Sequence, residues 1–216
     1  MRKVKIGLLG LVLCLLLAGH PLAADFEAEP PPYPVVSTSY RYFVQDGIGY
    51  YLLSGNVAGE FSQFTIATYF FQRYGVKHIV IYLNSPGGEV FEGLGFAQLM
   101  LDLQSRGITI EVRCYGLAAS AAAIILAAGT PGHRYIADCS FVMVHELWVF
   151  KLFSVQSVSQ VEKEAKVMRK LQNAMIEMLA RRIKLSPEEL KRRCAEETWI
   201  SAQQAIEWGF ADHLIK

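Results

Sequence analysis

The chain has 216 residues, enough for one α/β domain with a sizeable hydrophobic core and a short additional segment. Its 21 Lys and Arg residues nearly balance its 20 Asp and Glu residues, which gives a formal net charge of +1. Because the composition has no basic excess, we expect no nucleic-acid partner.

The N-terminus is typical of a secretory signal peptide. Basic residues in the first five positions precede an uncharged, leucine-rich run over residues 6–19, and small residues follow up to Ala24. This order predicts a signal peptide over residues 1–24 and a periplasmic or secreted protein. The apolar run is shorter than the roughly 20 residues that span a bilayer. A membrane anchor through residues 6–19, retained if the segment is uncleaved, is the alternative.

A Pro-rich linker over residues 25–39 leads into a single domain over residues 40–216. Strand-like and helix-like patterns then alternate along the chain. The expected strands cover residues 50–53, 78–83, 108–114 and 141–144. The expected helices cover residues 61–74, 90–105, 120–128 and 158–179, with two more opened by capping boxes at Ser186 and Ser201. Alternating β and α elements predict an α/β fold with a parallel sheet flanked by helices.

Without residues 1–24 the chain keeps three cysteines, Cys114, Cys139 and Cys194. Three cysteines cannot all pair within one chain, so they form no disulfide framework. A bridge between Cys114 and Cys139 is conceivable if their strands are neighbours, while buried free thiols are the usual outcome in apolar strands. No spacing indicates a metal site, and we expect neither a metal nor a cofactor.

Three segments carry the residue types that acyl transfer requires. Residues 84–88 (Asn-Ser-Pro-Gly-Gly) follow a predicted strand and can aim a backbone N–H into a cleft, as an oxyanion hole needs. Ser120 opens a predicted helix among small residues, which leaves its hydroxyl uncrowded. His145 ends an apolar strand, where α/β sheets deliver side chains to a crevice.

Each of these segments has a plainer interpretation when it is considered alone. Pro-Gly-Gly is an ordinary turn, a Ser at a helix start is commonly an N-cap, and a lone His is usually structural. Their order along the chain favours chemistry, because an oxyanion donor, a nucleophile and a base each follow a predicted strand.

Together with residues 126–129, 134–135 and 199–209, these segments resemble the proteolytic subunit of Clp protease, and the similarity runs from about residue 47 to 215. The resemblance implies a crotonase-like fold, a spiral of ββα units, and hydrolysis of peptide bonds. It places the nucleophile on Ser120 and the general base on His145. The oxyanion donors then fall on the backbone N–H groups of Gly88 and Ala121.

The chain departs from the family pattern at two places. Glu197 stands where the family has the Asp that orients the histidine, a role that Glu performs in some hydrolases. The plainer alternative is a solvated charge, with Asp138 or Asp212 as less favoured substitutes. Residues 147–153 are apolar and lack the family's Gly-rich segment, part of the handle through which two rings meet. A homo-oligomer is still expected, but the double ring is in doubt.

Export would separate the protein from cytosolic ATP-driven unfoldases. We therefore expect no ATPase partner and an ATP-independent serine endopeptidase that acts on small or unfolded polypeptides. One alternative is a Ser–Lys dyad, as in the signal peptide peptidase A group, with Lys163, Lys166 or Lys170 as base. Further alternatives are a catalytically inactive, peptidase-like scaffold and acyl-CoA chemistry.

Overall fold

The structure is a computed structural model that describes residues 36–37, 40–148 and 157–216. The predicted signal peptide, most of the predicted linker and residues 149–153 of the apolar segment lie outside the described residues. No helix in the described part of the chain combines the length and the apolar character that crossing a membrane requires.

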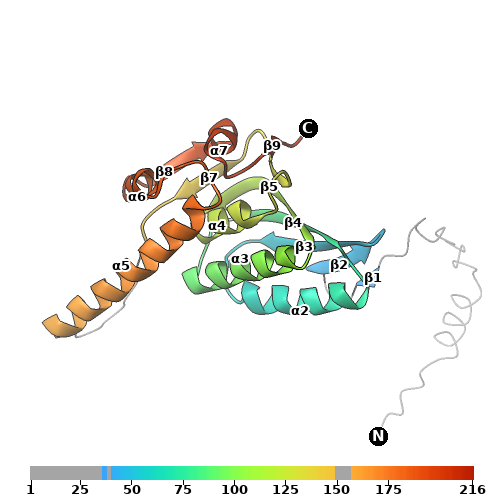
Figure 1. The fold of residues 1–216 in the computed structure, drawn as a ribbon, viewed down its shortest axis with the longest axis horizontal. Helices are drawn as coiled ribbons and strands as arrows, with labels where there is room; N and C mark the ends of the chain where they lie inside the picture. Colours follow the sequence, from blue (N-terminus) through green and yellow to red (C-terminus); the bar gives the residue numbers. More distant parts are fainter. Residues whose placement is uncertain (1–35, 38–39, 149–156) are drawn as a thin grey trace, which may run out of the picture. The chain divides into compact units, whose positions relative to one another are not determined.

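One mixed sheet organises the domain (Figure 1). In the described residues it has nine strands, in the order β1-β2-β3-β4-β5-β6-β9, with β7 paired to β5 and β8 paired to β7. The strands are β1 (Val36–Ser37), β2 (Tyr42–Gln45), β3 (Ile48–Ser54), β4 (His78–Ser85), β5 (Thr109–Ala119), β6 (Arg134–Ile136), β7 (Phe141–Val144), β8 (Thr198–Ser201) and β9 (His213–Leu214).

The predicted α/β class is confirmed, and the sheet adds antiparallel margins to the expected parallel centre. The pairs β3–β4, β4–β5, β5–β6, β5–β7 and β6–β9 are parallel. The pairs β1–β2, β2–β3 and β7–β8 are antiparallel. The carboxyl ends of the parallel strands therefore meet at one edge of the sheet, where α/β proteins place their sites.

Helices complete the layers. They are α2 (Glu60–Arg73), α3 (Val90–Ser105), α4 (Ala121–Ala128), α5 (Val158–Ala180), α6 (Pro187–Ala195) and α7 (Ala202–Trp208). Helices α2 and α3 lie side by side against one face of the sheet, and α4 lies next to α3 (Figure 1). Every residue of α4 is buried, as expected of a helix that is apolar all round. Gly93 of α3 permits this packing, since a Cβ there would lie 2.8 Å from the Cβ of Ala121.

Strand β5 is longer than the sequence predicts, and it changes partner along its length. On one side Val112–Cys114 pair with β6, while Leu117–Ala119 pair with β7. Gly116 sits at the change with φ 98°, and a Cβ there would lie 2.9 Å from Oδ1 of Asn84. Only glycine fits both the backbone angle and the close approach. The extension carries the chain directly to Ser120, beside the strand that ends at His145.

Of the two predicted capping boxes, one is complete and the other is partial. Ser201 forms the complete capping box. Ser186 accepts a hydrogen bond from the N–H of Glu189, but the Glu189 carboxylate binds Arg192 and Arg193 and does not return a bond to the cap.

All three described cysteines are free thiols. The conceivable Cys114–Cys139 bridge is not formed, because Cys139 lies exposed in a turn rather than in a neighbouring strand.

Candidate active site

Ser120 lies in the sharp turn between β5 and α4. Its backbone has φ 55° and ψ −121°, a conformation that non-glycine residues seldom adopt. The N–H of Ser120 donates to the carbonyl of Met143 at 2.8 Å, which fixes the turn against β7. The hydroxyl makes no capping hydrogen bond to α4. The side chain is therefore not used as an N-cap, and a strand-to-helix turn of this kind presents a nucleophile at the sheet edge.

His145 follows β7 directly and faces this serine. Its Nε2 lies 2.9 Å from Oγ of Ser120, within the range required for proton transfer between a nucleophile and its base. The pairing of Ala119 with Met143 brings the two strand ends together. The ring of Trp148 packs edge-on against the imidazole, with the ring centroids 5.2 Å apart. Ser120 and His145 thus form a hydrogen-bonded pair at the carboxyl edge of the sheet.

The Pro-Gly-Gly turn after β4 packs directly on the serine turn. Gly87 has φ 91°, and a Cβ there would lie 2.6 Å from the carbonyl oxygen of Ala119 and 2.7 Å from Cβ of Ser120. At Gly88, with φ 156°, a Cβ would collide with the carbonyl oxygen of Val57. Both glycines are needed because neither position has room for a side chain.

The backbone amides of Gly88 and Ala121 are the predicted oxyanion donors, and both residues lie at the cavity beside Ser120. Val57 pairs with the carbonyl of Gly87 and the N–H of Glu89, each at 2.8 Å, so this pairing does not use the N–H of Gly88. Ala121 is the first residue of α4, where the helix itself offers no acceptor for an N–H. Gly88 and Ala121 line the same cavity as Ser120. Two such donors beside a nucleophile can stabilise a tetrahedral intermediate.

A largely apolar cavity of about 320 Å³, bordered also by Glu89, adjoins Ser120 and His145. Its apolar walls include Ile124, Val144, Leu147, Met168, Met175 and Leu179. Cys194 also lines the cavity, and burial together with the charge of Glu146 raises the pKa of its thiol to about 11. The thiol is therefore neutral at physiological pH, and the cavity suits an apolar side chain.

Helix α5 contributes to this wall in a way that the sequence did not show. Met168, Met175 and Leu179 follow helical spacing, which predicts only an apolar face. Whether such a face fills a core or borders a cavity depends on what packs against it, and periodicity does not contain that information. A methionine pair on the stripe is the one sequence feature that hints at an adaptable pocket.

Glu197 is the predicted site residue that the structure does not bring to the others. Its neighbour Thr198 pairs with Val144, but its side chain is exposed and forms neither a hydrogen bond nor an ion pair with His145. Its own backbone has φ 49°. Within the described residues, the buried Nδ1 of His145 has no hydrogen-bond partner. Among the residues that the structure describes, no third catalytic group therefore contacts His145.

The other sequence candidates lie elsewhere. Asp138 accepts from the side chain of Gln203 at 3.0 Å, and Asp212 is held by Arg134. Three lysines of α5, Lys163, Lys166 and Lys170, are exposed and none lines the cavity. The geometry therefore offers no support for a Ser–Lys dyad.

Comparison with known proteins matches the chain to one protease family. A model of the Clp protease family matches residues 51–216. The ATP-dependent Clp protease proteolytic subunit of Porphyromonas gingivalis (strain W83) is 31% identical over 141 residues, covering 65% of this chain and 60% of that protein. The subunit of the same name from Bacteroides fragilis (strain ATCC 25285) is 34% identical over 140 residues, covering 64% of each. The alignments thus span less than two thirds of these relatives' length.

The family match covers most of the chain, and it includes the strand-end turn, the serine turn and the histidine whose geometry is described above. The chain belongs to the Clp protease family.

Proposed function

We propose that the protein is a serine peptidase that hydrolyses peptide bonds in small or unfolded polypeptides. One observation carries the proposal: a serine in a strained turn, free of any capping role, lies 2.9 Å from the Nε2 atom of a histidine. The relatives named as proteolytic subunits support the same reaction class.

The proposed reaction follows from the positions of these groups. Ser120 Oγ attacks the carbonyl carbon of the scissile bond, and its proton passes to Nε2 of His145. The N–H groups of Gly88 and Ala121 receive the oxyanion. His145 then gives the proton to the leaving amine, and water hydrolyses the acyl-enzyme through the same base. No metal or cofactor takes part in these steps.

The cavity supports a preference for the substrate. Its largely apolar walls and neutral thiol favour an apolar side chain next to the scissile bond, and Glu89 is the one carboxylate among the described residues that line it. We expect peptides with Leu or Met at that position to be cleaved fastest.

The orientation of His145 is the open part of the mechanism. Glu197 is the third member by its position in the family pattern, and it would have to turn inward to accept a hydrogen bond from Nδ1. The proposal therefore rests on the Ser–His pair and the two amides, with Glu197 as a candidate that acts only after such a movement.

A fluorophosphonate probe tests the proposal on the untagged chain lacking residues 1–24. We expect the wild type to be labelled, Ser120→Ala not to be labelled, and His145→Ala to react about 10⁶-fold more slowly. Ser105→Ala is the matched control, since this exposed serine only donates to the carbonyl of Asp102. An unlabelled wild type would overturn the peptidase proposal. Labelling that survives in His145→Ala but disappears in Lys170→Ala would establish the dyad instead.

A peptidase-like scaffold without turnover is the second candidate, and the unpartnered Nδ1 of His145 is the observation that favours it. A scaffold would bind unfolded polypeptide without being labelled by the probe. Polypeptide binding measured by fluorescence anisotropy, in parallel with labelling, separates the two functions.

We also propose that the protein acts outside the cytoplasm as a homo-oligomer, without ATP or an ATPase partner. The signal-peptide pattern of residues 1–24 supports export. Sequencing the N-terminus of the protein recovered from the periplasm or medium should show cleavage after about Ala24. Recovery only in membranes with the full N-terminus would establish the anchor through residues 6–19. Casein degradation should be the same with and without ATP.

A further inference from the structure

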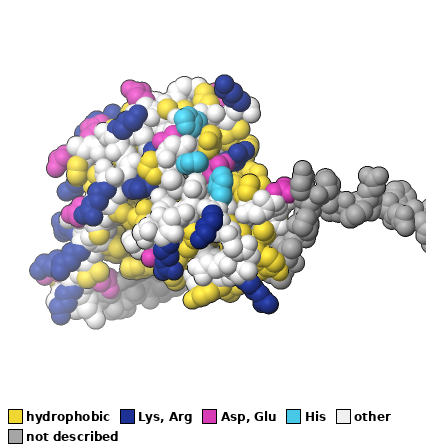
Figure 2. All heavy atoms as spheres, turned by 45° about the vertical axis from the view of Figure 1, so that its right-hand side comes forward, with side chains coloured by type: hydrophobic (Ala, Val, Ile, Leu, Met, Phe, Trp, Pro, Cys, Tyr) yellow, Lys and Arg dark blue, Asp and Glu magenta, His cyan; other side chains and the backbone are white. Residues whose placement is uncertain are grey.

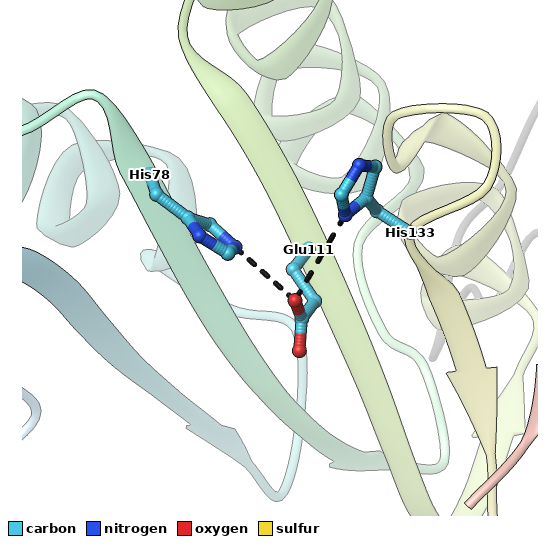
Figure 3. A group of neighbouring side chains, drawn as sticks. All are labelled: His78, Glu111 and His133. Atoms are coloured by element: carbon cyan, nitrogen blue, oxygen red, sulfur yellow. Dashed lines mark hydrogen bonds and ion pairs between the residues drawn. The ribbon is translucent and has the colours of Figure 1, made fainter.

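Two histidines and one carboxylate converge at the edge of the sheet opposite the active site. His78 is the first residue of β4, Glu111 lies near the start of β5, and His133 precedes β6. Figure 3 shows the three side chains pointing toward one another. Nε2 of His78 lies 3.1 Å from Oε2 of Glu111, and Nδ1 of His133 lies 4.0 Å from the same oxygen. One ligand atom from each residue lies within 4.8 Å of the others.

Two imidazole nitrogens and one carboxylate oxygen form a ligand set that Zn²⁺ favours, with a fourth position left for water. Zinc binds nitrogen at about 2.0–2.1 Å and oxygen at about 2.0–2.2 Å, so the ligand atoms of a tetrahedral site lie roughly 3.3 Å apart. The His78–Glu111 distance already matches this spacing. Nδ1 of His133 has to approach Oε2 of Glu111 by about 0.7 Å, and ligand atoms that lie up to 4.8 Å apart have to approach by up to about 1.5 Å, which side-chain rotation can supply.

A second, independent observation points to a missing partner. Nδ1 of His133 is buried and has no hydrogen-bond partner among the described residues. A buried polar atom without a partner is costly, so its lone pair or its proton needs a group at this position. Nδ1 faces the carboxylate of Glu111 (Figure 3). A cation between the two would satisfy both.

The surroundings hold the carboxylate in place. Glu111 is 5% exposed, and its other oxygen accepts from Nε of Arg113. Outer hydrogen bonds of this kind orient metal ligands in known sites. Arg113 also offsets the charge of Glu111, so the metal enters a locally neutral site, and its affinity should be lower than at a site with several carboxylates.

Sheet pairing fixes the backbone of all three residues. His78 pairs with Thr109, and Val80 pairs with Glu111. The N–H of Val112 donates to the carbonyl of His133 at 2.9 Å. Ligands carried on such rigid elements keep their spacing. The histidines themselves are part-exposed, at 35% and 41% of their side chains, so a cation can enter from solvent. Histidine side chains gather on one solvent-facing side of the molecule in Figure 2.

We propose that His78, Glu111 and His133 form a Zn²⁺ site that joins β4, β5 and the turn before β6, with water as the fourth ligand. The sequence-based expectation of no metal rested on motif spacing, and these ligands come from three separate segments that no motif connects. The site lies at the amino ends of the parallel strands, whereas Ser120 and His145 follow their carboxyl ends. The inference does not depend on the proposed peptidase function.

Zinc titration of untagged, chelator-treated protein against a chromophoric competitor tests the site. We expect one Zn²⁺ per chain in the wild type. His78→Gln, Glu111→Gln and His133→Gln should each lower the affinity by at least about 100-fold, since even loss of an outer-shell partner costs 10–100-fold. His213→Gln is the matched control, being a histidine outside the cluster, and it should bind as the wild type does.

Two further measurements make the result unambiguous. Co²⁺ in the site should give ligand-field absorption without a thiolate charge-transfer band, which separates this site from binding at the exposed Cys139. Zn²⁺ should raise the Tm of the wild type and leave the Tm of His133→Gln unchanged. The proposal is overturned if the folded wild type binds no stoichiometric Zn²⁺ at about 100 µM, or if the three cluster variants bind as tightly as His213→Gln.

Discussion

Ser120 occupies a backbone conformation that costs a non-glycine residue about 1–3 kcal/mol, so its surroundings must hold it there. Two contacts do so. The carbonyl of Met143 accepts from its N–H, and the bare Cα of Gly87 lies directly against the turn. In this backbone conformation the hydroxyl of Ser120 lies at the cavity and does not cap α4.

A methyl group at Gly87 should therefore damage the site more than the fold. Gly87→Ala would place a Cβ 2.6 Å from the carbonyl oxygen of Ala119 and force the serine turn to move. We expect probe labelling to fall at least about 100-fold, the effect of losing oxyanion geometry. Gly107→Ala is the control, because Gly107 has φ 79° with open space around it. It should lose about 1–2 kcal/mol of stability and keep its labelling rate.

Glu197 gives a prediction with two clearly separated outcomes. In this geometry its carboxylate is exposed and does not contact His145, so Glu197→Gln should change the labelling rate by less than about threefold. A carboxylate that orients the imidazole is worth about 10⁴-fold in rate. A loss of that size, with unchanged thermal stability, would show that Glu197 turns inward during the reaction.

At the scale of elements, α5 has two environments along its length. Its later turns supply Met168, Met175 and Leu179 to the cavity, and Met175 and Leu179 are buried. Its first turns are largely exposed and extend beyond the neighbouring elements (Figure 1). The C-terminal part of the helix thus lines the cavity, and its N-terminal part is exposed to solvent.

A charge on the cavity side of α5 should change the substrate preference. Met168→Glu would place a carboxylate in the apolar wall, and a pocket contact of this size is worth about 10–200-fold in kcat/KM. We expect that loss for peptides with Leu before the scissile bond, and a smaller loss for peptides with Lys there. The exposed neighbour Val167 provides the control: Val167→Glu should leave both rates unchanged. Equal losses for the two peptides would mean that the cavity does not hold this side chain.

At the scale of the whole domain, Arg134 ties the C-terminal segment to the rest. Its guanidinium donates to Asp212 through Nε and Nη2, and to the carbonyls of Gly209 and Arg182 through Nη1. Asp212 also accepts from the N–H of Gly132 at 2.8 Å. Burial, which alone would raise the pKa of Asp212, is outweighed by the hydrogen bonds and charge of Arg134, so the pKa is lowered.

Asp212→Asn should destabilise the domain by about 3 kcal/mol at pH 7, because it leaves a buried guanidinium without its counter-charge. The folded pKa of Asp212 lies below its unfolded value of about 3.9, so its contribution is fully present above that pH and is lost as the pH falls through the folded pKa. Urea unfolding should give a constant difference between wild type and variant from about pH 8 to pH 5. The difference should shrink below about pH 4.

Asp138→Asn controls for the loss of one carboxylate. Asp138 is exposed and accepts a single hydrogen bond from Gln203, so the change should cost less than about 0.5 kcal/mol. A difference between wild type and Asp212→Asn that persists unchanged at low pH would contradict the assignment of this stability to the ionised Asp212.

The parts of the fold that follow from local pattern were predictable. The continuous apolar run from His78 gives β4, and helical spacing gives α3 with the expected bounds, 90–105. The tail of β5 was missed because Gly116 and the alanines after it have little strand preference, and only pairing with β7 makes them a strand. Strands β6, β8 and β9 have two to four residues, too short for a periodic pattern.

The functional site also has a part that the sequence predicts and a part that it does not. Ser120, His145 and the two glycines follow from order along the chain, because each comes directly after a strand. The cavity wall on α5 and the outward direction of Glu197 depend on packing and on a backbone angle of φ 49°, which no sequence pattern encodes. The His78–Glu111–His133 cluster depends on the register of three strands that lie far apart in the sequence.

Strand β5 carries Glu111 near one end and leads to Ser120 at the other. At about 3.3 Å per residue, the two side chains are separated by up to roughly 30 Å. At about 30 Å the Coulomb energy between two unit charges is only about 0.5 kcal/mol at an effective dielectric constant of about 20, so a cation bound at Glu111 exerts a weak field on His145. A larger influence of one end on the other would have to pass through the strand itself, including Gly116, where β5 changes partner. Acylation of Ser120 and metal loading at Glu111 can therefore be measured on one molecule as two independent titrations.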